Sequence, residues 1–211
     1  MHNQGKEQPR QIKVWDIVVR SFHWSLVTLF TLDYISGDGF DWLHALFGYG
    51  ILILLAVRLL WGLAGTKYAR FSNFIHGRRA VKDYALSLLS GRAPHYLGHN
   101  PLGGWMIMAL LVCLFFTSWS GLEAYGAKGH GPLAQGAGAI IQTARGDEGT
   151  NDNGDTGLWG GLHEALANLT LFLVLMHIGG VLVSSLLQKE NLVRAMWTGY
   201  KRQRPEDDAP D

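Results

Sequence analysis

The stretch Gly157–Gly180, GLWGGLHEALANLTLFLVLMHIGG, decides the fold of this chain. It is long enough to cross a bilayer as a helix, and Glu164 is its only Asp, Glu, Lys or Arg residue. Two histidines, His163 and His177, nevertheless interrupt its apolar side chains. Ionisable side chains are costly inside a membrane and usually mark a function. The stretch therefore predicts a membrane helix that binds a partner through imidazole.

Four long apolar stretches occur in the chain, at about residues 17–35, 42–65, 101–122 and 158–187. The second and third are apolar around their whole circumference, which disfavours a soluble bundle with one apolar stripe per helix. Only helices satisfy the backbone of such segments in lipid, because open strands would leave polar groups unpaired. We therefore expect an all-α membrane protein, a four-transmembrane-helix bundle that forms a single domain over residues 1–211.

Composition excludes several other classes of protein. A net charge of +1 over 211 residues does not favour nucleic-acid binding. The single cysteine, Cys113, excludes an internal disulfide framework, a thiolate zinc site and covalent haem attachment through CxxCH. The first dozen residues are polar and do not resemble a cleavable signal peptide.

The Lys and Arg residues predict the orientation in the membrane. Sixteen of the 18 lie before or at the start of the first helix, from the end of the second helix through the connector 66–100, or in the tail 188–211. Since basic residues concentrate on the cytoplasmic side, both termini and the connector should be cytoplasmic and the loop 123–157 periplasmic. This distribution is typical of a multi-pass membrane protein.

The two long connections have different expected structures. In the cytoplasmic one, GRRAVKDYALSLLSG predicts an amphipathic surface helix. In the periplasmic one, PLAQGAGAIIQTA predicts a short interfacial helix and GDEGTNDNGDTG predicts a loop. Four carboxylates, Asp147, Glu148, Asp152 and Asp155, make the end of this loop acidic.

Four histidines lie in or at the ends of the expected helices. His163 and His177 are 14 residues apart, which places them about 40° apart around the helix and roughly 21 Å apart along it. His44 lies at the outer end of the second helix and His23 near the inner end of the first. Depth therefore pairs His44 with His163 and His23 with His177. The remaining histidines, His2, His76, His95, His99 and His130, are expected to be solvated or to cap helices.

Haem is the ligand that suits such pairs. Zinc needs four ligands, or three and a water, and neither thiolates nor enough carboxylates lie at these depths. Haem iron takes two axial ligands, and two imidazoles supply them without charge. Gly48, Gly179 and Gly180 would let a flat ring approach the backbone. A proton relay would need a chain of acids and histidines that is not seen in the middle of the helices, whereas simple hydrogen bonding between helices stays open for some of the histidines.

Two arginines are candidates for contacting haem propionates. Arg58 follows His44 by 14 residues and so lies at the depth of the inner pair. A buried arginine in a membrane needs an anion, and a propionate would supply one. Arg20, one turn before His23, could do the same. The alternative for both is that the side chain extends to the lipid headgroups, and for Arg20 we favour that alternative.

Several segments together resemble the bacterial cytochrome b561 family, in particular the branch that includes the membrane b-type cytochrome subunit of nickel-iron hydrogenases. They are VWDIVVRSFHW, HALFGYG, YLGHNPLGGWMIM, LHEALAN and MHIGGVLVSSLLQKENLVRAMWTG, and the resemblance extends over about residues 13–201. It implies two b haems, each bound by two histidines of the set His23, His44, His163 and His177. The acidic loop and the ENLVRAMWTG tail look more like stand-alone members, which are thought to work with c-type cytochromes.

These observations predict an electron carrier without catalytic residues of its own. An iron bound by two histidines has no open coordination position, so it transfers electrons and does not bind oxygen. The expected route joins the quinone pool to a periplasmic c-type cytochrome or hydrogenase, with a quinone site near His23. A superoxide:quinone oxidoreductase is disfavoured because its anionic substrate would favour a positive outer surface. A haem-free membrane anchor, the direction of electron flow and homo-oligomerisation stay open.

Overall fold

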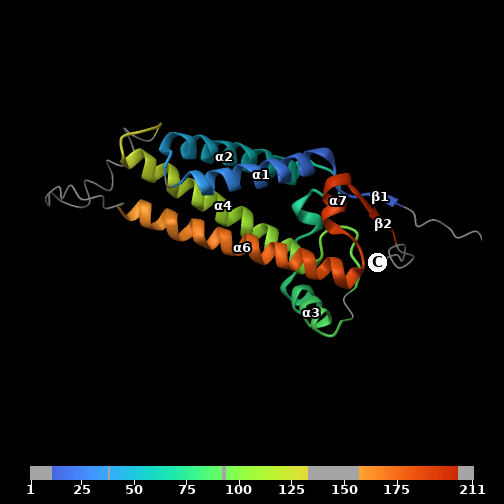
Figure 1. Cartoon of the computed structure of the whole chain (residues 1–211). Helices are drawn as coiled ribbons and strands as arrows, with labels where there is room; N and C mark the ends of the chain where they lie inside the picture. Colours follow the sequence, from blue (N-terminus) through green and yellow to red (C-terminus); the bar gives the residue numbers. More distant parts are fainter. Residues whose placement is uncertain (1–10, 38, 92–93, 133–156, 204–211) are drawn as a thin grey trace, which may run out of the picture. The chain divides into compact units, whose positions relative to one another are not determined.

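The computed structural model describes residues 11–37, 39–91, 94–132 and 157–203. In these ranges the regular structure is helical apart from a single pair of short strands, and loops and turns connect the elements (Figure 1). The helices are α1 (Ile17–Ser36), α2 (Asp41–Ala64), α3 (Arg78–Leu89), α4 (Pro101–Ala127), α6 (Leu158–Gln188) and α7 (Leu192–Thr198), with a 3-10 turn, η1, at Phe71–Asn73. The predicted all-α class is confirmed. The interfacial helix, the loop and the four carboxylates predicted for the periplasmic connection lie outside the described residues.

Three helices, α2, α4 and α6, are long and apolar enough to cross a membrane. Helix α1 is not among them, because Arg20, Asp33 and several hydroxyl side chains make it more polar. Two of those hydroxyls are satisfied within the helix, since Thr28 and Thr31 donate to the carbonyl oxygens four residues earlier at 3.0 and 2.8 Å. A fourth membrane span therefore stays a prediction.

The chain divides into two compact units, which we describe separately. The first, here called the basic unit, comprises Met1–Phe22, Arg58–Ile107 and Met176–Asp211. The second, here called the apolar unit, comprises His23–Val57 and Met108–Leu175. Each long helix contributes to both units, and the four predicted histidine ligands are distributed between them.

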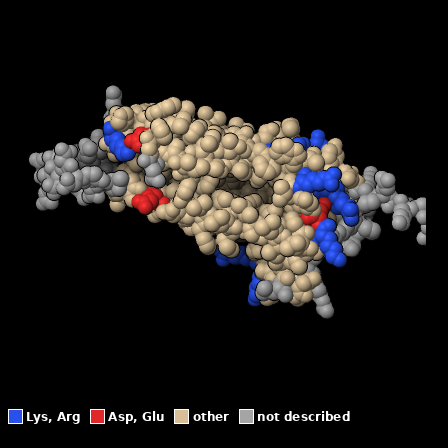
Figure 2. Space-filling model, in the orientation of Figure 1, with Lys and Arg blue, Asp and Glu red and all other residues tan. Residues whose placement is uncertain are grey.

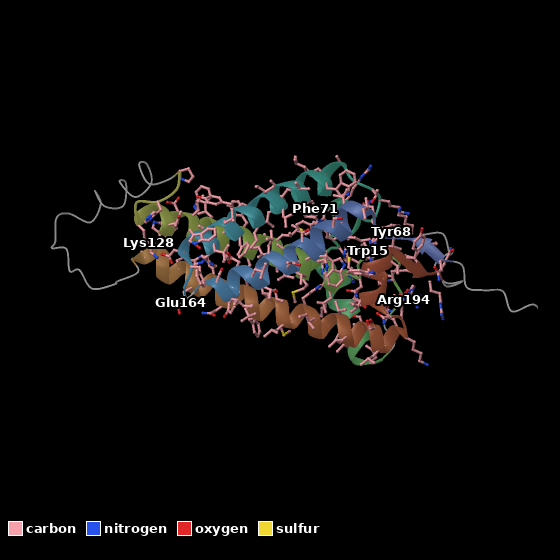
Figure 3. The ribbon with its side chains drawn as sticks, turned by 45° about the horizontal axis from the view of Figure 1, so that its top comes forward. Trp15, Tyr68, Phe71, Lys128, Glu164 and Arg194 are labelled. Atoms are coloured by element: carbon pink, nitrogen blue, oxygen red, sulfur yellow. The ribbon has the colours of Figure 1, made fainter. Side chains whose placement is uncertain are left out.

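A core of small and aromatic side chains holds the basic unit together. Its buried residues are Val14, Trp15, Val19, Ala69 and Ala195, and Tyr68 is among the side chains packed against them. Figure 3 labels Trp15 and Tyr68, which lie side by side in this core. The core joins the chain before α1 to the loop after α2 and to α7, so its members come from distant parts of the sequence.

The two strands join the ends of the described chain. Strand β1 (Gln11–Lys13) pairs antiparallel with β2 (Tyr200–Arg202), with Ile12 opposite Lys201. The backbone N–H groups of Val14 and Trp15 both donate to the carbonyl oxygen of Gly199, at 2.9 and 3.1 Å. Sequence reasoning missed this sheet, because three-residue strands carry no periodic signal.

Asp16 fixes the start of α1. One carboxylate oxygen accepts the backbone N–H of Val19 at 2.9 Å, as an N-terminal cap does. The other accepts the indole N–H of Trp61 at 3.0 Å and the hydroxyl of Thr66 at 2.6 Å. Burial by itself would raise the pKa of Asp16, but these hydrogen bonds outweigh it and hold the pKa below its ordinary value.

The two short helices, α3 and α7, show an amphipathic face and defined helix caps, respectively. Helix α3 is the amphipathic helix expected in the connector, with Tyr84 buried and the charged residues Arg78, Arg79, Lys82 and Asp83 exposed. Asn191 caps the start of α7, because its side chain accepts the N–H of Arg194 at 2.7 Å. Gly199 caps its end, and the φ of 89° there suits a residue without a side chain.

Polar side chains join α4 to α6 inside the apolar unit. The hydroxyls of Thr117 and Thr170 lie 2.9 Å apart, and Thr170 also donates to the sulfur of Cys113 at 3.1 Å. All three residues are buried. Small polar residues of this kind let two membrane helices approach closely and hydrogen-bond to each other.

Candidate functional site

His44 of α2 and His163 of α6 come together in the apolar unit. Their ring centroids lie 5.7 Å apart and their planes are inclined at 76°. Both residues belong to the same compact unit, so the juxtaposition predicted from their depth is present. Both imidazoles come from helices and not from loops, and the residues around them belong to α1, α2, α4 and α6.

Each of these histidines uses its Nδ1 for a hydrogen bond to a backbone carbonyl. His163 Nδ1 lies 2.9 Å from the oxygen of Thr117, and His44 Nδ1 lies 2.9 Å from the oxygen of Asp33. A carbonyl oxygen only accepts, so Nδ1 carries the hydrogen in both rings and Nε2 carries the lone pair. Metal-binding histidines are typically oriented by such a bond on the nitrogen that does not bind the metal.

The helix geometry explains why these carbonyls are accessible. Asp33 lies in the last turn of α1, where carbonyl oxygens lack some of their intrahelical donors, and its oxygen also accepts the Ser36 hydroxyl at 3.0 Å. Thr117 lies four residues before Gly121, at which an added Cβ would come within 2.8 Å of the His163 ring. The missing side chain at Gly121 therefore makes room for the imidazole beside α4.

A pocket opens beside the two rings. Its lining is mostly apolar and includes Phe30, Leu114 and Tyr125, and also Gly48, which has open space where a Cβ would project. The pocket measures about 70 Å³, which is less than a porphyrin fills. The donor pair, the tautomers and the apolar lining fit haem, and a bound porphyrin would require the lining side chains to move apart.

The basic unit contains His177 and Arg58. Arg58 is 4% exposed, and its guanidinium lies 4.8 Å from the centre of the Phe71 ring, which Figure 3 labels. One of its terminal nitrogens, Nη2, donates to the Ala69 oxygen at 3.1 Å. The other, Nη1, is buried and has no hydrogen-bond partner among the described residues. Arg58 therefore does not extend to the headgroups, and its orphaned nitrogen fits a carboxylate such as a propionate.

Arg20 has a partner that the sequence did not predict. It donates from Nη2 to the carbonyl oxygen of Trp197, at the end of α7. An arginine at this position also complements the negative end of a helix dipole. The structure thus connects Arg20 to α7, and its contact with a propionate stays a prediction.

Two histidines expected to be solvated or capping are partly buried and packed against other side chains instead, so that prediction was wrong for them. The side chain of His95 is 2% exposed and lies 3.4 Å from a carboxylate oxygen of Glu190. His99 packs between Trp15 and Phe74, with ring centroids 4.5 and 4.7 Å away, and its Nδ1 is buried without a hydrogen-bond partner among the described residues. The signal that could have found His99 is its place in GHNPLGG, just before Asn100, which accepts the N–H of Gly103 and caps α4.

His99 is neutral in this setting. Burial, and then the charges of Arg58 and Lys201 together with His177, lower its pKa to about 3. His99 thus lies close enough to His177 and Arg58 for a positive charge on either to lower its pKa. The basic unit therefore places a neutral imidazole, His99, within electrostatic range of both His177 and the buried guanidinium of Arg58.

The remaining predicted ligand, His23, lies in the apolar unit, where its ring meets Trp24 edge to face at 5.1 Å between centroids. His177 lies in the basic unit, so the pairing of these two histidines stays a prediction. Within the described ranges, no group of three or more His, Cys, Asp and Glu side chains comes together as a metal-ion site. The candidate ligands that the structure brings together are the two imidazoles of His44 and His163.

Apolar membrane-length helices and an oriented histidine pair define the class of membrane cytochromes in which imidazole binds haem. The family model described as prokaryotic cytochrome b561 matches residues 14–199, so the chain belongs to that family, and the predicted resemblance is confirmed. Its members are b-type haem proteins of membrane electron transfer. Comparisons with curated proteins and with solved structures gave no match.

Proposed function

We propose that this protein carries electrons across the bacterial inner membrane through two b haems, each bound by two histidines. His44 and His163 bind one haem, and His23 and His177 bind the other. The route runs between the quinone pool and a redox protein at the periplasmic surface, either a c-type cytochrome or a hydrogenase. α1 serves as the fourth membrane span in this proposal, and both termini are cytoplasmic.

The observation that carries the proposal is the pair His44 and His163. Their Nδ1 atoms donate to the oxygens of Asp33 and Thr117, which leaves both Nε2 lone pairs for an axial ligand role. When bound there, haem supplies reversible one-electron chemistry at its iron. The chain orients the two ligands, makes them more basic through the Nδ1 bonds and surrounds them with apolar side chains.

The second haem rests on the sequence spacing and on the surroundings of His177. Arg58 Nη1 is a buried donor without a partner among the described residues, and it would bind a propionate by a charge-assisted hydrogen bond. His99, neutral and packed between two aromatic rings, forms part of the same environment. These residues favour an anionic, planar ligand over a bare metal ion.

Haem stoichiometry tests the proposal. The purified wild-type protein should hold two haems per chain and show the reduced α band of a b-type cytochrome. His163→Ala should hold one. His130→Ala is the matched control, because His130 is exposed at the end of α4 and should leave both haems bound. A colourless wild-type protein would refute the proposal and leave the haem-free membrane anchor, whereas two haems in His163→Ala would refute the ligand assignment alone.

A further inference from the structure

A wide cleft opens in the basic unit at the end of α6. It measures about 940 Å³, within the usual size range of ligand sites, and is partly open to the outside. Most of its lining comes from the end of α6, from one side of α7 and from β2, and Gln11, Arg20 and His95 complete it from other parts of the chain. Because α6 is long and apolar enough to cross a membrane, the cleft lies where such a span reaches the headgroups.

The side chains around the cleft are strongly basic. Its five cations are Arg20, Lys189, Arg194, Lys201 and Arg202. Figure 2 shows Lys and Arg gathered over the region of α7 and the strands. Glu190 is the single carboxylate among the lining residues. The cleft therefore has an excess of positive charge that its own residues do not neutralise.

Glu190 does not neutralise the other cations of the cleft, because its carboxylate oxygens already have hydrogen-bond and ion-pair partners. They lie 3.3 Å from Lys201 Nζ and 3.4 Å from His95 Nε2, and one accepts the backbone N–H of Arg202 at 3.0 Å. Burial would raise the pKa of Glu190, but Lys201 and these hydrogen bonds hold it below its ordinary value. Arg20 has a further unused donor, since its Nε is buried without a hydrogen-bond partner among the described residues.

Apolar side chains flank the same cations. Trp197, which lines the cleft, is 64% exposed, and Val193, next to Arg194, is 51% exposed. Leu186 and Leu187, in the last turn of α6, are also exposed. Tryptophan and cations beside apolar side chains are typical of the interface between hydrocarbon and headgroups.

We infer that this cleft binds the phosphate headgroup of an anionic membrane lipid. Arginine side chains such as Arg194 and Arg202 match phosphate oxygens with two parallel hydrogen bonds. The exposed leucines of α6 and Trp197 offer a surface for the acyl chains, which a soluble phosphate compound would not use. Basic pockets beside membrane helices favour anionic headgroups on electrostatic grounds. The inference does not depend on the proposed haem function.

The test uses the full chain, purified in detergent and freed of lipid. Thermal unfolding and native mass spectrometry would be followed while phosphatidylglycerol is added in mixed micelles. Phosphatidylcholine and inorganic phosphate at the same concentrations form the other two arms. The cleft variant is Arg194→Gln with Arg202→Gln, and the matched control is Arg78→Gln with Arg79→Gln, which removes two exposed arginines of α3 outside the cleft.

Phosphatidylglycerol should raise the unfolding temperature and remain bound to the wild type and the control. The cleft variant should need roughly 25-fold more lipid for half-saturation, since each cation near a headgroup contributes a factor of about five. Arg194→Gln alone should need about five-fold more lipid for half-saturation. Because this single variant keeps Arg202, it still tests the cleft if the double variant folds poorly. Equal half-saturation of the cleft variant and the control would overturn the inference. An equal response to inorganic phosphate would assign the cleft to soluble anions and overturn the lipid assignment.

Discussion

The apolar unit and the basic unit build histidine environments in different ways. In the apolar unit, His44 and His163 are oriented by carbonyl oxygens of α1 and α4, so helix backbones supply both hydrogen bonds. In the basic unit, His99 before α4 interacts electrostatically with His177 and with Arg58, and the buried Arg58 is held by the Ala69 carbonyl and the Phe71 ring of the loop after α2. Helices alone thus suffice to orient an imidazole pair, whereas a buried cation requires contacts from loops.

This difference suggests different roles for the two proposed haem sites. The apolar unit offers few charges near its histidines beyond Asp33, so its ligand set depends on tautomer and close packing. The basic unit contains a buried positive charge, Arg58, which with His177 interacts electrostatically with His99, and positive charge favours the reduced state of a nearby iron. We therefore expect the haem at His177 to have the higher reduction potential of the two.

The largest expected effect comes from His177→Ala. Loss of this ligand should remove about half of the bound haem, because the pair His44 and His163 would remain intact. The haem left in His177→Ala should have a lower potential than the haem left in His163→Ala, which a spectroscopic redox titration measures. Retention of both haems in His177→Ala would contradict the assignment of the second pair, and identical potentials would contradict the comparison of the units.

A second prediction concerns the close approach at Gly121. Gly121→Val should push the His163 ring away from the Thr117 carbonyl, since even a Cβ would lie 2.8 Å from that ring. Overpacking of this kind costs about 1–3 kcal/mol, so haem affinity in the apolar unit should fall about 10- to 100-fold. Gly161→Ala, with no atom within 4 Å of its added Cβ, is the control and should bind haem normally. Haem titration of the apoprotein measures both, and equal affinities would show that the glycine is not required.

The buried charge gives the third prediction. Arg58→Gln should lower the potential of the haem at His177 by roughly 50 mV, because removing a positive charge destabilises the reduced iron. The haem in the apolar unit should be almost unaffected. Arg58→Lys keeps the charge and should restore most of the potential, while losing the stacking on Phe71. A potential that changes equally in Arg58→Gln and Arg58→Lys would assign the effect to packing and not to charge.

The ion pair of the basic unit gives a smaller, pH-dependent effect. The folded-state pKa of Glu190 is lowered, so its contribution to stability is present above its unfolded pKa and is lost as the pH falls through the folded value. Glu190→Gln should therefore lower the free energy of unfolding by about 2 kcal/mol at pH 7 and by much less in strong acid. Thermal unfolding over the range pH 2–7 measures this. A constant difference across that range would mean that Lys201 does not depend on the Glu190 charge.

Much of the fold and part of the site could be predicted from the sequence. The apolar runs predicted α2, α4 and α6 to within a few residues, because lipid-length helices carry a strong and continuous signal. The spacing of the histidines predicted the approach of His44 to His163, since helix geometry converts sequence distance into depth and face.

The parts that the sequence did not predict depend on long-range packing. Neither the pairing of β1 with β2 nor the packing of His95 and His99 follows from any local pattern, because each requires segments more than 80 residues apart to meet. The same holds for the oriented tautomers, which depend on carbonyls of helices other than the histidines' own. A periodic pattern reports which face of a helix is apolar, but not which backbone oxygen will lie opposite it.

The smallest expected effect concerns the segment between α4 and α6, the chain connection of the apolar unit. Its four carboxylates, Asp147, Glu148, Asp152 and Asp155, would attract a basic surface of a periplasmic redox partner if this end of the helices meets it. Changing all four to amides should slow electron exchange with a basic c-type cytochrome several-fold at low salt, and much less at physiological salt, where exposed charges are screened. Stopped-flow measurement of haem oxidation at two ionic strengths tests this. A rate that is unchanged at low salt would place the docking surface elsewhere in the chain.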